Sequence, residues 1–131
     1  MGWGMERFLW ICVAGGLGTG SRYLIGLWTE RHWGSGFPYG TLLVNVVGCF
    51  LIALVMKVAT QSPLFPPNLR LALATGFIGG FTTYSSFNYE ATALLQAGAR
   101  GTALVYCGLT LLLCFVAGVM GLDLGARLAN A

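Results

Sequence analysis

Uncharged hydrogen-bonding side chains lie inside long apolar stretches of this sequence. Asn45 has hydrophobic residues on both sides, and Tyr106 and Thr110 are four residues apart, which places their hydroxyls on one face of a helix. A polar group in hydrocarbon must find a partner, and amides and hydroxyls both donate hydrogen bonds. We therefore expect these donors either to bind an anion or to bond to neighbouring helices, and both roles remain open.

The densest polar run lies between Ala74 and Glu90, where glycines precede a series of hydroxyl residues. These residues are Thr82, Thr83, Tyr84, Ser85 and Ser86. Glycine is a poor helix former, and Ser and Thr compete for backbone hydrogen bonds, so we predict that a helix breaks at about Gly79–Thr83. Freed carbonyls would suit a small cation, and the N-terminus of the following half-helix would attract an anion. A helix kinked only for packing is the simpler alternative.

Three further residues have chemistry that depends on where they face. Phe87 shares a helix face with Thr83 and Glu90. The positive edge of its ring can face an anion, although a Phe in a membrane helix more often packs. Glu90 lies near the end of an apolar stretch, where an interfacial position alone would explain it. Arg22 shares a face with glycines of the first apolar stretch, so we expect it to face protein rather than lipid.

The composition identifies the surroundings of these side chains. Of 131 residues, 56% are hydrophobic and 8% are charged, against about 45–50% and about 25% in soluble domains. The net charge of +3 comes from basic residues spread singly, with no patch for nucleic acid. We predict an integral membrane protein with a single domain over 1–131 and no nucleic-acid partner. The sequence pairs no nucleophile with a base and contains no P-loop or metal-ligand cluster, so we predict no enzymatic activity.

The apolar stretches predict an all-α membrane protein with four transmembrane helices. Their approximate ranges are 6–28, 41–60, 69–96 and 101–124, and the third is the one expected to break in mid-membrane. A signal peptide at the N-terminus is a weaker alternative, because the first apolar run is long and further spans follow it. The four cysteines lie inside the predicted spans and form no CxxC pair, which favours small apolar fillers over disulfides or metal ligands.

The basic residues give only a weak orientation signal. Four spans place both termini on one side; Arg7, Lys57, Arg70 and Arg127 fall on that side, Arg31 and Arg100 on the other, with Arg22 near the latter. So small a difference permits insertion in both orientations, and hence an antiparallel dimer. A single orientation with cytoplasmic termini remains the alternative.

Two segments resemble the signatures of the Fluc (CrcB) fluoride channel family. These are Gly76–Phe87 and Gly40–Gly48, the second similar to the motif GT-x-x-VN-x-x-G. The resemblance covers essentially the whole chain. It implies an antiparallel, dual-topology homodimer in the bacterial inner membrane, with two pores that passively export fluoride and so relieve its toxicity.

The resemblance also implies roles for individual residues. Those lining or bordering the pore would be Asn45, Phe87, Tyr84, Thr83, Ser85, Ser86, Tyr106 and Thr110, with Arg22 supporting the anion pathway and Glu90 near one pore end. The carbonyls of Gly79 and Thr82 would hold a structural Na⁺ on the dimer axis. Tyr84 stands where the family commonly has Phe, and Thr110 where Ser is common; Cys114 receives no role.

Two other functions are compatible with a small four-span protein. A proton-coupled multidrug exporter would require a carboxylate deep in the first helix, and positions 8–21 contain none. A non-transporting assembly subunit would need packing glycines. It would need neither the predicted break nor the Tyr106 and Thr110 hydroxyls on one helix face. The sequence therefore favours the fluoride channel.

Overall fold

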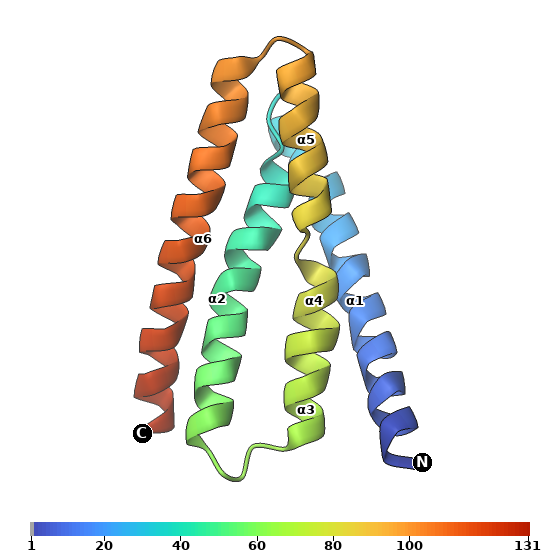
Figure 1. The fold of residues 1–131 in the computed structure, drawn as a ribbon, viewed down its shortest axis with the longest axis vertical. Coiled ribbons are helices and arrows are strands. Elements are labelled where there is room, and N and C mark those ends of the chain that lie inside the picture. The colour runs from blue at the N-terminus through green and yellow to red at the C-terminus, as the bar shows by residue number, and fades with distance from the viewer. Residues whose placement is uncertain (1) are drawn as a thin grey trace.

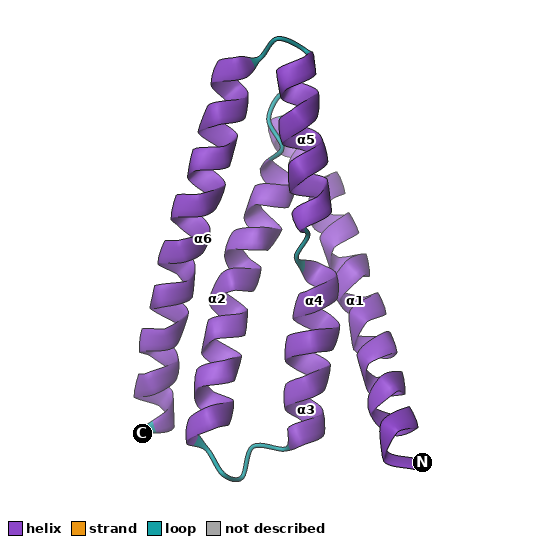
Figure 2. Ribbon diagram, viewed as in Figure 1, coloured by secondary structure: helices purple, strands orange, loops and turns teal. Residues whose placement is uncertain are grey.

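The structure is a computed structural model that describes residues 2–131. Three long helices are continuous: α1 (Gly2–Trp33), α2 (Tyr39–Gln61) and α6 (Arg100–Ala129). Between α2 and α6 the chain forms a segmented rod (Figure 2). Its parts are α3 (Pro67–Leu71), the π-helical η1 (Ala72–Ile78), α4 (Gly79–Phe81) and α5 (Tyr84–Gln96). The described residues contain no β-strand.

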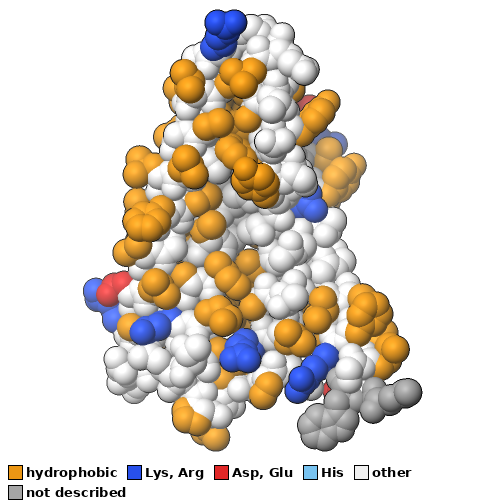
Figure 3. All heavy atoms as spheres, viewed as in Figure 1, with side chains coloured by type: hydrophobic (Ala, Val, Ile, Leu, Met, Phe, Trp, Pro, Cys, Tyr) orange, Lys and Arg blue, Asp and Glu red, His pale blue; other side chains and the backbone are white. Residues whose placement is uncertain are grey.

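The long helices have the dimensions and surface of membrane spans. Gly4–Trp33, Tyr39–Gln61 and Arg100–Ala129 are each long and apolar enough to cross a bilayer. Large hydrophobic side chains such as Leu17 and Phe115 are 63% and 74% exposed, far more than a water-soluble fold tolerates over such an extent. Hydrophobic groups cover much of the face seen in Figure 3. The chain is a multi-pass membrane protein.

The helices pack as two pairs, and glycines allow the close approach within each pair. α6 follows α2 along its length, and a Cβ on Gly121 would clash with the Phe50 carbonyl oxygen. α1 packs against η1 and α4, and a Cβ on Gly18 would clash with the Phe77 carbonyl oxygen. Within the described chain, the backbone of α6 does not come close to that of α1, η1 or α4. The two pairs therefore leave a groove between them.

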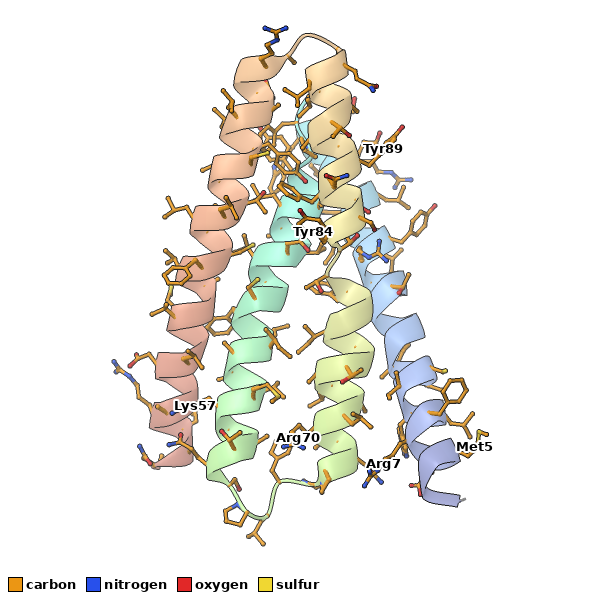
Figure 4. All side chains as sticks on the ribbon, viewed as in Figure 1. Met5, Arg7, Lys57, Arg70, Tyr84 and Tyr89 are labelled. Carbon is orange, nitrogen blue, oxygen red and sulfur yellow. The ribbon has the colours of Figure 1, made fainter. Side chains whose placement is uncertain are left out.

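The termini and the connectors agree with the sequence predictions. Both termini lie at one end of the molecule (Figure 1). Figure 4 shows Arg7, Lys57 and Arg70 toward this same end. The turns before α2 and α6 contain Gly34 and Gly98, whose φ angles of +79° and +78° suit glycine. The helices extend beyond the predicted ranges at most ends, most clearly in α1 and α6.

The predicted interruption of the third helix is confirmed, but it lies at the end of the predicted segment. Thr82 and Thr83 have extended backbones, with φ/ψ of −83°/156° and −153°/114°. We call these two residues the break. Gly79 and Gly80, at the start of the predicted segment, remain helical. Gly80 instead lets α4 approach α1, because a Cβ there would clash with the Gly15 carbonyl oxygen.

Candidate functional site

Asn45 holds the break in its extended conformation. Its side-chain amide donates to the Thr83 carbonyl oxygen at 3.0 Å, and its Oδ1 accepts from the Thr83 backbone N–H at 2.8 Å. Asn45 is only 8% exposed, so both bonds lie in a low-dielectric environment that strengthens them. Of the two roles left open for Asn45, the structure assigns the interhelical bond. The second N–H of the Asn45 amide takes no part in these two bonds to Thr83.

The hydroxyls after the break form a local network at the start of α5. Thr83 is the N-cap, and its Oγ1 accepts from the Ser86 backbone N–H at 3.2 Å. The same oxygen lies 3.3 Å from the Ser85 hydroxyl and 3.1 Å from the Ser86 hydroxyl. Backbone N–H groups at a helix N-terminus carry partial positive charge. The break therefore places the N-terminus of α5, with its partial positive charge, beside the hydroxyls of Thr83, Ser85 and Ser86.

The end of α4 is held from the other side by α1. The Gly80 carbonyl oxygen accepts from Arg22 Nε at 3.1 Å and from Thr19 Oγ1 at 3.3 Å. A cation at a helix C-terminus is favourable because the last carbonyls are unpaired. The prediction that Arg22 faces protein is confirmed. Arg22 belongs to α1, which packs on α4, whereas α6 lies on the other side of α4 (Figure 1). Arg22 therefore holds the broken helix from the side away from α6.

Carbonyl oxygens at the break lose their normal helical partners, and those of Gly79 and Thr82 are two of them. In a continuous helix the Thr83 N–H would bond to the Gly79 oxygen, but it donates to Asn45 instead. The Ser86 N–H would reach the Thr82 oxygen, but it donates to the Thr83 side chain. Gly79 and Thr82 both line the groove between the helix pairs. Their oxygens are hard ligands of the kind that a small cation prefers.

The groove has a volume of about 430 Å³ and is bounded by α2, η1, α4, the start of α5 and α6. In Figure 3 the molecular face is hollowed at mid-height. The lining is mostly apolar; its polar and aromatic members include Asn45, Thr82, Thr83, Tyr84, Phe87 and Thr110. Thr110 is 8% exposed, and its buried hydroxyl has no hydrogen-bond partner among the described residues. Such a group costs about 1–3 kcal/mol unless something bonds to it.

A second polar cluster lies beyond the groove, toward the α5–α6 turn. Glu90 accepts from the Thr41 hydroxyl and from the Tyr106 hydroxyl, each at 2.7 Å. Tyr106 is fully buried, and the rings of Phe37 and Phe87 meet it edge-on at centroid distances of 5.4 and 5.1 Å. The Tyr106 hydroxyl is therefore committed to Glu90. It does not line the groove with Thr110.

The sequence-predicted site residues thus divide into three groups. One group lines the groove: Asn45, Thr83, Tyr84, Phe87, Thr110, Gly79 and Thr82. A second group, the Glu90–Tyr106 cluster and Arg22, lies beside the groove. The third group, Ser85 and Ser86, lies at the N-terminus of α5. Tyr84 is 78% exposed at the break (Figure 4), with its ring 5.7 Å from that of Phe87.

Sequence reasoning missed Thr41 and Thr19 as hydrogen-bonding partners. Thr41 had a detectable signal, because it precedes Asn45 by one helical turn and shares its face. Thr19 had none, since its bond to the Gly80 oxygen depends on how α1 crosses α4.

These features define a class: a polytopic helical membrane protein in which amide, hydroxyl and carbonyl groups gather at an interruption in one helix. A family model described as "CrcB-like protein, Camphor Resistance (CrcB)" matches residues 9–122. The chain belongs to the CrcB family.

Curated relatives match nearly the whole chain. One from Sorangium cellulosum (strain So ce56) is 44% identical over 124 residues, covering 95% of this chain and 98% of the relative. One from Anaeromyxobacter sp. (strain K) is 52% identical over 113 residues, covering 86% and 90%. One from Thermus thermophilus is 43% identical over 127 residues, covering 97% and 99%. All three bear the name "Fluoride-specific ion channel FluC".

Proposed function

We propose that this protein is a passive, fluoride-selective ion channel rather than an enzyme. The observation that carries the proposal is the Thr110 hydroxyl, which is buried in the groove without a partner among the described residues. The identity of the transported ion comes from the family relatives, which are named as fluoride-specific channels. A strongly hydrated small anion needs donors that replace its water, and an unpaired hydroxyl is such a donor.

The groove offers further donors to the same ion. The second N–H of Asn45 is left after its bond to Thr83, and the Phe87 ring presents a positive edge. The start of α5 adds the Thr83, Ser85 and Ser86 hydroxyls, while Glu90 and Tyr106 border one end of the route. Tyr84, exposed at the break, completes the aromatic border beside Phe87. Arg22 acts indirectly, because it holds the end of α4.

The channel would be an antiparallel, dual-topology homodimer of single-domain, four-span chains. The groove is open on one side, so one chain alone does not enclose a path. The rod from α3 to α5 would provide the fourth span, with its break in mid-membrane. Non-helical backbone at that depth is tolerated where protein or a wet cavity surrounds it. The weak orientation signal of the basic residues is consistent with insertion both ways.

We also propose a structural Na⁺ held by the carbonyl oxygens of Gly79 and Thr82. The donor set fits, because these oxygens have lost their helical partners to the Asn45 and Thr83 side chains. Paired oxygens from two chains would complete the ligands. Bound there, the cation would stabilise the break by neutralising its exposed carbonyls.

In the bacterial inner membrane, such a channel would need no energy source to export fluoride. The negative interior of the cell drives anions outward through a passive path. Export would keep the cytoplasmic fluoride concentration low and so relieve toxicity.

The function is tested by fluoride and chloride efflux from liposomes that contain the wild type, Thr110→Ser or Thr110→Val. We expect fast fluoride loss without chloride loss for the wild type and Thr110→Ser. Thr110→Val should slow fluoride efflux by about tenfold or more, because a donor worth over about 1.4 kcal/mol is lost. Its folding should not suffer, since the hydroxyl it removes has no partner in the described chain. Equal fluoride rates for Thr110→Val and the wild type would overturn the role of the groove.

A further inference from the structure

Two thiols face the same groove from neighbouring helices. Cys49 of α2 and Cys114 of α6 both line it, and both are partly exposed. The two side chains therefore border the same space. α2 and α6 are held together here by small residues; one turn after Cys114, Gly118 faces the Cys49 carbonyl oxygen, to which an added Cβ would lie at 4.0 Å. The thiols thus lie opposite each other across the contact between α2 and α6.

The surroundings restrict what this thiol pair can bind. Among residues 2–131 no group of three or more His, Cys, Asp or Glu side chains could hold a metal ion. Within these residues the pair therefore lacks the further ligands of a four-coordinate zinc site. Two thiolates alone suit a soft cation that accepts linear, two-fold coordination. Two thiolates with a divalent ion are electrically neutral, which low-dielectric surroundings require.

We propose that Cys49 and Cys114 form a two-thiolate binding site for one soft divalent cation of the Hg²⁺ type. Binding converts two thiols and Hg²⁺ into an S–Hg–S bridge and releases two protons, so charge and atoms balance. The bridge ties α2 to α6 and occupies the groove wall one helical turn beyond Asn45 and Thr110. The site itself follows from the thiol geometry; its effect on ion flux rests on the proposed fluoride path.

The binding test uses the full-length protein, purified without added thiol and exposed to Hg²⁺. Intact-mass measurement should find one mercury in place of two protons per chain, with only Cys12 and Cys107 then reacting with a maleimide. Removing the mercury should require about a hundredfold more competing monothiol than in Cys49→Ser or Cys114→Ser, because the second thiolate binds intramolecularly. Cys12→Ser and Cys107→Ser are the matched controls and should behave like the wild type.

Two outcomes would overturn the site: separate mercury ions on single cysteines, or Cys49 and Cys114 that stay open to maleimide after Hg²⁺ addition. Neither readout depends on transport, so neither can be mistaken for failure of the channel proposal. In liposomes, Hg²⁺ should cut fluoride efflux at least about tenfold in the wild type, and a low concentration of monothiol should not reverse this inhibition. In the two single serine variants the same monothiol concentration should restore fluoride efflux. A bridged protein with unchanged fluoride efflux would support the site and contradict the groove as the fluoride path.

Discussion

At the scale of single residues, Asn45 has the most specific role in the structure. Its amide satisfies both backbone groups of Thr83, which a continuous helix would otherwise pair. The sequence marked Asn45 as polar and buried but left its partner open, because the partner is a backbone group on a distant segment. Geometry was needed to show that the same side chain both fixes the break and retains a free donor.

We expect Asn45→Asp to lower both stability and fluoride flux. The aspartate oxygen that replaces the amide nitrogen cannot donate to the Thr83 carbonyl and places negative charge beside it. A buried, unpaired group of this kind costs about 1–3 kcal/mol, so the thermal midpoint of the detergent-solubilised protein should fall, with fluoride efflux reduced at least about tenfold. Asn88→Asp is the control, since Asn88 is exposed on α5. Equal behaviour of the two variants would contradict the role given to Asn45.

Arg22 provides a second residue-scale prediction. Arg22→Gln removes a charged donor from the Gly80 carbonyl, a bond type worth about 1.5–3 kcal/mol. The unfolding midpoint should therefore fall, while the exposed Arg31→Gln should leave it unchanged. If Arg22→Gln is as stable as the wild type, the end of α4 does not depend on this contact.

At the scale of helices, glycine positions decide which pairs pack closely. Gly121→Ala adds a Cβ that meets the Phe50 carbonyl, and the resulting shift should cost about 1–3 kcal/mol. The matched variant Gly108→Ala lies on the same helix, where nothing lies within 4 Å of the added atom. Size-exclusion profiles and unfolding midpoints of the two variants should differ clearly. Similar profiles would mean that the α2–α6 contact is looser than described.

The break also predicts an effect of sodium. If the Gly79 and Thr82 oxygens hold Na⁺, replacing Na⁺ by N-methylglucamine should lower the unfolding midpoint and the fluoride efflux together. Choline should act like N-methylglucamine, because neither large organic cation fits between backbone oxygens. Unchanged stability and flux in both sodium-free buffers would refute the proposed ion.

The elements show how far sequence reasoning extends. Apolar stretches and turn glycines predicted α1, α2, α6 and their connectors, because hydrophobic length and positive φ are local properties. The interruption was predicted from the Gly and hydroxyl content, but its position was not exact. Gly80 stays helical because α1 packs on it, and that contact is not encoded locally. The Glu90–Tyr106 bond was missed for the same reason: it joins two helices across a turn.

At the scale of the whole molecule, apolar side chains cover the outer surface and polar groups gather in the groove. Most residues of α1 are exposed, as in a helix with one face toward lipid, whereas the polar groups collect where the two helix pairs separate. The groups in the groove are donors and carbonyl oxygens, and the carboxylate nearby, Glu90, is bonded to two hydroxyls. This arrangement favours passive anion conduction over proton-coupled export.

The most direct test is fluoride efflux from liposomes loaded with potassium fluoride and diluted into fluoride-free buffer. We predict that fluoride leaves rapidly only after valinomycin lets potassium follow, because a passive channel moves net charge. Liposomes loaded with potassium chloride should retain chloride under the same conditions. Fluoride efflux that ignores valinomycin but requires a proton gradient, or chloride loss as fast as fluoride loss, would contradict a passive, fluoride-selective channel.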